Sequence, residues 1–175
     1  TVHAYGGGHV AYLPVLTGRA MVSCDYYAFP PDRHEYDMPR RAFRSSTDTI
    51  YQYFDWMNVT HVVTYHERWK RRFREEPGRY EEAAAFRDIA VFAVKGLREG
   101  LFAENSGRVR ADFNRLEVEV DDPDHPAVLK YQWHDGLQAD PPASCYPQPV
   151  HEELTLVGLH PRGRRKVEIR FRGGM

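Results

Sequence analysis

Cysteine is scarce in this chain. Its 175 residues include two cysteines, Cys24 and Cys145, and neither belongs to a CxxC pair. The sequence therefore excludes a structural zinc site built from paired cysteines. The sequence leaves two possibilities open: a disulfide between the two cysteines, or two separate thiols. The outcome depends on whether the compartment is oxidising.

Long hydrophobic runs and a charge of one sign are missing as well. No apolar stretch approaches the roughly 20 residues that cross a bilayer as a helix, and no signal peptide is visible. The formal net charge is -1, so no overall attraction to nucleic acid or anionic lipid is expected. The basic clusters at 70–72 and 162–166 are short, and we interpret them as solvated surface.

The motifs of common catalytic sites are missing too. The glycines at 6–8 lack both the Lys-Ser/Thr of a phosphate-binding loop and the GxGxxG spacing, and no GxSxG surrounds Ser23. Among nine histidines there is no HExxH, and His61 and His66 have no third ligand at usable spacing. The sequence therefore predicts no catalytic residue, no metal site and no cofactor.

Hydrophobic residues make up 42% of the chain, enough to bury a core in one domain or two small ones. The chain starts at Thr1 and not at Met, from which we expect a piece of a longer or processed protein. Residues 1–45 are rich in Gly, Pro and Tyr, which predicts an irregular layer over the core.

Residues 47–96 carry alternating helix and strand signals. Helical spacing of apolar residues predicts helices over 47–57 and 67–75, the first of them with capping residues at Ser46 and Thr47. A β-branched run predicts a strand over 59–65, and a strand pair is expected over 80–94. This order favours a small mixed α/β sheet with helices packed on it.

After Gly96 the hydrophobic pattern changes to a period of two. Apolar and polar residues alternate over 116–120, 129–133 and 167–171, and Asp-, Pro- and Gly-rich turns separate these stretches. Strands of this kind have one face in a core and one in water, so several of them imply an antiparallel β-sandwich or open barrel.

The expected fold class is therefore α+β. A small mixed α/β subdomain with an irregular N-terminal layer is predicted over 1–96, and an antiparallel β-sandwich-like subdomain over 97–175.

Two clusters could contact a ligand. They combine aromatic rings with carboxylates: Asp25, Tyr26 and Tyr27 precede a Pro-Pro pair, and Trp133, His134 and Asp135 stand at the end of a predicted strand. Aromatic faces beside acids suit the CH and OH groups of a sugar. The competing interpretation, that a Trp ending a core strand simply packs in the core, also stays open.

Residues 56–65, WMNVTHVVTY, are followed by an aromatic helix and by IAVFAV at 89–94. This segment resembles part of large polytopic bacterial membrane proteins that are similar to the C superfamily of membrane glycosyltransferases, which use lipid-linked sugars. Residues 9–14 and 17–19 resemble the stretch that leads out of the final membrane span in such proteins, and their C-terminal portion is β-rich, like 114–171 here.

The resemblance implies an extracytoplasmic accessory domain, tethered to the membrane-embedded part of the same polypeptide and contacting a glycan or polypeptide acceptor. It carries over no catalytic residue, because the catalytic acid of that superfamily lies in an early loop that this sequence does not contain. Nucleic acid is not an expected partner. The alternatives are a stand-alone secreted carbohydrate-binding or protein-interaction module and a small hydrolase or metalloenzyme.

Overall fold

In the computed structural model, residues 2–4, 21–22, 46–112 and 114–172 are described. The described chain is mostly antiparallel β-sheet, with 49% strand in three sheets and two short helices. The expected mixed α+β fold, mostly β, is confirmed. The chain divides into two compact units, Thr1–Leu97 and Arg98–Met175, which are described separately below as unit 1 and unit 2.

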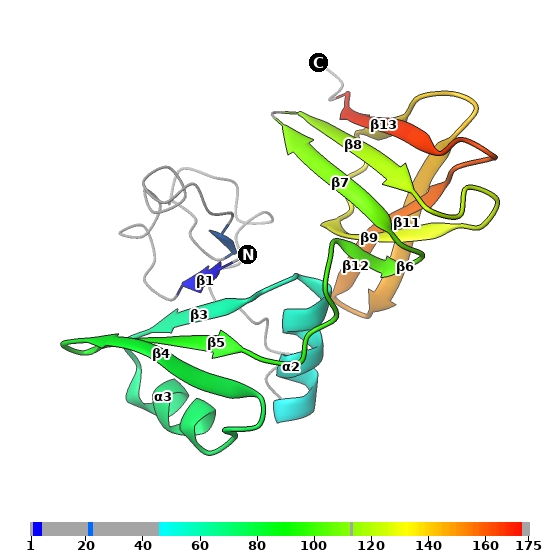
Figure 1. Cartoon of the computed structure of the whole chain (residues 1–175). Coiled ribbons are helices and arrows are strands. Elements are labelled where there is room, and N and C mark those ends of the chain that lie inside the picture. Colours follow the sequence, from blue (N-terminus) through cyan, green and yellow to red (C-terminus); the bar gives the residue numbers. More distant parts are fainter. Residues whose placement is uncertain (1, 5–20, 23–45, 113, 173–175) are drawn as a thin grey trace. The chain divides into compact units, whose positions relative to one another are not determined.

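Unit 1 contains a five-stranded sheet in the order β2-β1-β3-β5-β4 (Figure 1). Its central strand β3 pairs parallel with β1 and antiparallel with β5, and β5 forms a hairpin with the edge strand β4. The strands are β1 Val2–Ala4, β2 Met21–Val22, β3 His61–Thr64, β4 Tyr80–Phe86 and β5 Ile89–Val94.

The described part of unit 1 contains the helices α2 (Thr47–Trp56) and α3 (Glu67–Arg74). The start of α2 is set by Ser46, whose hydroxyl accepts a hydrogen bond from the Thr49 N–H at 3.1 Å. Both helices lie where the apolar spacing predicted them. No helix in the described part of the chain is both long and apolar enough to cross a membrane.

Aromatic side chains join the helices of unit 1 to its sheet. The Phe73 ring from α3 lies with its centroid 4.7 Å from that of Tyr80 and 5.2 Å from that of Phe92 on the sheet. Phe54 of α2 lies within 6.4 Å of both Phe73 and Tyr80. This cluster fixes α3 on the face of the sheet that Phe92 occupies.

Unit 2 consists of two four-stranded antiparallel sheets, ordered β10-β13-β8-β7 and β11-β12-β9-β6 (Figure 1). The first sheet is formed by β7 Gly107–Asp112, β8 Arg115–Val120, β10 Leu137–Ala139 and β13 Lys166–Phe171. The second is formed by β6 Phe102–Glu104, β9 Ala127–Gln132, β11 Ser144–His151 and β12 Leu154–His160.

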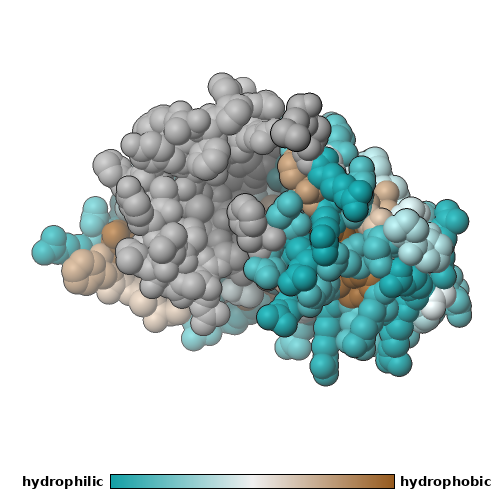
Figure 2. All heavy atoms as spheres, turned by 90° about the horizontal axis from the view of Figure 1, so that it is seen from above, coloured by the Kyte–Doolittle hydropathy of each residue, from teal (hydrophilic) through white to brown (hydrophobic). Residues whose placement is uncertain are grey.

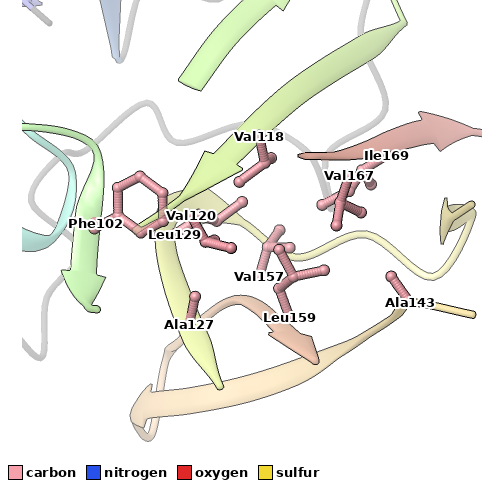
Figure 3. Close-up of a cluster of buried hydrophobic side chains, with 10 residues drawn as sticks. All are labelled: Phe102, Val118, Val120, Ala127, Leu129, Ala143, Val157, Leu159, Val167 and Ile169. Atoms are coloured by element: carbon pink, nitrogen blue, oxygen red, sulfur yellow. The ribbon is translucent and has the colours of Figure 1, made fainter. Parts of the chain in front are cut away.

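The two sheets of unit 2 share one hydrophobic core (Figure 3). Val118 and Val167 pair across β8 and β13, while Leu129 and Val157 pair across β9 and β12, and all four side chains are buried. The alternation seen in the sequence thus places every second side chain of β8, β9 and β13 between the sheets.

Replacing a buried side chain of this core tests its contribution to stability. Leu129→Ala should lower the free energy of unfolding by about 2–5 kcal/mol, because Leu129 is fully buried and the change leaves a cavity. Urea unfolding followed by circular dichroism measures the loss. The control is Phe86→Ala, which should stay within about 0.5 kcal/mol because Phe86 is 69% exposed. Equal losses from both substitutions would contradict the assignment of the core.

Candidate ligand-binding site

A cleft of about 240 Å³ opens between the two sheets of unit 2. Its floor is apolar, with Leu116 and Ile169 from one sheet and Tyr131 and Val157 from the other. Further residues line the walls and mouth: Asp112, Asn114, Arg115, Gln132, His134, Leu137 and Phe171. The cleft therefore combines an apolar floor and aromatic rings with polar groups, as small-molecule sites do.

The loop between β9 and β10 contributes His134 to this cleft. The Trp133 N–H donates to the Thr155 carbonyl at 2.9 Å, so the pairing with the next strand continues up to the start of the loop. The loop then turns back, because the Leu137 N–H donates to the His134 carbonyl at 2.9 Å. These two bonds hold His134 at the first position of a tight turn, with Asp135 and Gly136 at its tip.

The His134 ring has a defined contact and a defined tautomer. Its centroid lies 4.7 Å from that of Phe171, and the two rings are nearly perpendicular at 83°. His134 Nδ1 accepts a hydrogen bond from the Gly136 N–H at 3.3 Å. In the neutral ring the proton is then on Nε2, which makes this nitrogen a hydrogen-bond donor.

Gly136 provides the space for the Phe171 ring. A Cβ atom at position 136 would lie 2.4 Å from Cε2 of Phe171, far inside van der Waals contact. The Arg172 N–H donates to the Gly136 carbonyl at 2.7 Å and ties the loop to the end of β13. Only glycine at position 136 allows the loop and the ring to approach this closely.

The charges at the mouth of the cleft are organised by Arg115. Its guanidinium lies 3.3 Å from the Asp112 carboxylate, 3.2 Å from that of Glu117 and 3.7 Å from that of Glu168. The Tyr131 hydroxyl, which also lines the cleft, is neutral at physiological pH, and burial raises its pKa further above the ordinary value. The cleft thus offers neutral rings inside and a paired ionic group at its edge.

A larger hollow of about 530 Å³ lies over β7, β8 and β13. Its polar side chains have mixed signs, namely Arg108, Arg110, Glu117, Glu119, Asp140, Arg164, Lys166 and Glu168. Several of them are paired: Arg164 lies 2.5 Å from the Asp140 carboxylate, and Glu119 lies 4.0 Å from Arg165, which does not line the hollow. Self-paired surface charges of this kind indicate a solvated sheet face more than a ligand site.

The three residues predicted at 133–135 have different surroundings in the structure. His134 lines the cleft, whereas Trp133 packs against the shared core and its indole N–H donates to the Asp135 carboxylate at 2.9 Å. The other predicted cluster, Asp25, Tyr26 and Tyr27, lies outside the described residues.

Sequence reasoning missed Tyr131 and Phe171 as members of the cleft. Both residues lie near the ends of strands in which apolar and polar residues alternate. At such an end, a side chain that faces the core is not fully covered by the opposite sheet. Their position at these strand ends was the sequence signal that could have indicated a cleft residue. Tyr131 and Phe171 come together, however, only through pairings between strands that are far apart in the chain.

The described residues bear on two further kinds of chemistry, that of a metal site and that of a reactive thiol. Within 46–112 and 114–172, no group of three or more His, Cys, Asp or Glu side chains is placed to hold a metal ion. The Cys145 thiol donates a hydrogen bond to the Leu137 carbonyl at 3.3 Å, and burial raises its pKa, which disfavours the reactive thiolate. Cys24 lies outside the described residues.

Comparison with known proteins identifies no relative of this chain. No family model matches it, and neither a curated protein nor a solved structure does.

Substitution of Gly136 tests the geometry of the cleft. Gly136→Ala should cost about 1–3 kcal/mol of unfolding free energy, because the new methyl group displaces the Phe171 ring. Urea unfolding measures this cost. The matched control is Gly78→Ala in unit 1, where a Cβ would meet no atom within 4 Å and where the change should be neutral or stabilise by up to about 1 kcal/mol. If Gly136→Ala were as harmless as Gly78→Ala, the close packing of Phe171 would be wrong.

Proposed function

We propose that this chain is a non-catalytic accessory domain that contacts a carbohydrate through the cleft of unit 2. The observation that carries the proposal is the convergence of Tyr131, His134 and Phe171 around one apolar-floored cleft. Sugar rings present CH groups on their faces and hydroxyl groups on their edges. Aromatic walls with polar groups at the mouth match both kinds of surface.

The size of the cleft limits the ligand. At about 240 Å³ it is smaller than the roughly 300–1,000 Å³ of sites for drug-sized molecules. We infer that it takes a single sugar ring, with the rest of a glycan extending into solvent.

The polar groups supply the recognition of hydroxyls. Nε2 of His134 is a donor, and the carboxylate of Asp112 is an acceptor at the same mouth. Arg115 adds further donors while it holds Asp112 in place. A sugar hydroxyl both donates and accepts, so this set can satisfy it from both sides.

The setting of the domain is proposed from the resemblance of residues 56–65 and 89–94 to polytopic membrane proteins. In this proposal the domain lies outside the cytoplasm, tethered to the membrane-embedded part of a glycosyltransferase-like polypeptide, and holds a glycan acceptor near that part. A stand-alone secreted module would use the same cleft. The complete reading frame separates the two settings, since only the first encodes upstream membrane spans.

Removing His134 tests the role of the cleft. His134→Ala should weaken the binding of a monosaccharide about tenfold, because it deletes one donor and one ring wall. Saturation-transfer NMR with glucose, galactose, mannose and N-acetylglucosamine, each added to the full chain, measures the binding. The matched control is His125→Ala, since His125 is an exposed histidine of unit 2 that does not line the cleft.

Two results would overturn the proposal. One is an absence of saturation transfer to every sugar of the panel. The other is an equal loss of binding in His134→Ala and His125→Ala, which would place the contact elsewhere.

A further inference from the structure

Among the described residues, the exposed large hydrophobic side chains are Tyr65, Phe86 and Ile89, with exposed fractions of 45%, 69% and 40%. All three belong to unit 1, and we refer to them as the tip cluster. Figure 2 shows hydrophobic residues gathered at the left end of the molecule, where Figure 1 places the turn between β4 and β5.

Strand register places Phe86 and Ile89 on one face of the sheet. Thr64 pairs with Ala90, and both are buried on the face that packs against the helices. Ile89, the neighbour of Ala90 in β5, therefore points to the opposite face, and Tyr65 follows directly after the end of β3. Phe86 pairs directly with Ile89, so it shares that face.

The lengths of α3 and β4 explain why no helix covers this end of the sheet in the described part of unit 1. Helix α3 has eight residues and extends about 12 Å, whereas the seven residues of β4 extend about 23 Å. Of the residues of β4, only Tyr80 is buried, at the end opposite the turn. The hairpin thus runs past its helix, and the tip cluster is not needed for the core of unit 1.

Basic residues stand next to the tip cluster along the chain. The segment 66–72, which follows Tyr65, and the turn 87–88 together contain five basic residues, Arg68, Lys70, Arg71, Arg72 and Arg87, against two acidic ones, Glu67 and Asp88. Glu67 pairs with Lys70 at 2.7 Å and Arg71 pairs with Glu75 at 4.0 Å, so the basic residues that remain in these two segments are Arg68, Arg72 and Arg87. Arg87 also lies over the Phe86 ring, 5.4 Å from its centroid. The net charge of -1 for the whole chain conceals this local excess.

We propose that unit 1 docks on an anionic lipid surface through this hairpin end. The side chains of Phe86, Ile89 and Tyr65 enter the interfacial layer, where aromatic and aliphatic groups are stabilised. The guanidinium groups of Arg68 and Arg87 lie at the level of the lipid phosphates, with their alkyl stems along the apolar residues. This surface is distinct from the cleft of unit 2 and needs no glycan.

A second copy of the chain fits the same end less well. Pairing between two β4 edges would require a regular free strand, but β4 carries a register shift between Glu82 and Ala84. Its edge also presents Glu81 and Glu82, of which Glu82 is already paired with Arg74 at 2.7 Å. Bulges and charges on an edge strand are devices that prevent such pairing.

Vesicle sedimentation with the full chain tests the proposal. The chain should bind vesicles of phosphatidylcholine mixed with phosphatidylglycerol, and should bind pure phosphatidylcholine weakly. F86S/I89S should lower this binding at least about tenfold through lost apolar insertion. R68E/R87E should lower it by a similar factor, because each arginine near the surface contributes to the attraction. Circular dichroism checks that both variants fold.

The control is R108E/R110E, which changes the net charge by the same amount on exposed positions of β7 in unit 2 and should bind like the unaltered chain. The proposal is overturned if the unaltered chain does not sediment with anionic vesicles, if F86S/I89S binds normally, or if the control loses as much binding as R68E/R87E. It is also overturned if the tip cluster instead drives self-association without lipid, lost in F86S/I89S. None of these outcomes bears on sugar binding by the cleft.

Discussion

The core shared by the two sheets of unit 2 is the constraint from which its cleft follows. Val118 and Val167 of one sheet can be buried only against side chains such as Leu129 and Val157 of the other, so the sheets must face each other. At the end of this core, the partly exposed Leu116 and Tyr131 join the buried Val157 and Ile169 to form the apolar floor of the cleft. The cleft is thus the edge of the core, and Phe171 and the loop at 133–136 shape its wall.

Unit 1 also has to cover the apolar face of its sheet, and it does so with helices where unit 2 uses a second sheet. The Phe54, Phe73 and Phe92 rings join the two helices to one face of the sheet, and they do so near the base of the hairpin. An eight-residue helix is too short to follow a seven-residue strand along its length. Both units therefore leave apolar side chains accessible where the covering element ends, and in unit 2 these side chains lie in a cleft that is also lined by several polar groups.

Local pattern was enough to predict single elements. The spacing of Ile50, Tyr53 and Phe54 after Ser46 predicted α2, and the alternation over 116–120 and 167–171 predicted β8 and β13. The site was harder, because its members meet through long-range pairing. The sequence predicts a ligand contact at His134 because Trp133 is its neighbour. In the structure the His134 ring contacts Phe171, and Trp133 packs against the core. Local sequence carries no information on which distant strand end lies beside a given loop.

The most direct test of a sugar site in unit 2 is a titration of the ¹⁵N-labelled chain with the same monosaccharides, observed through its backbone amides. Binding in the cleft predicts saturable shifts of the Gly136, Leu137 and Arg172 amides, which lie in the loop and at the end of β13 that form its wall. The amides of unit 1 should not move. Shifts centred on any other part of the chain, or no shifts at all with every sugar, would contradict a carbohydrate site in this cleft.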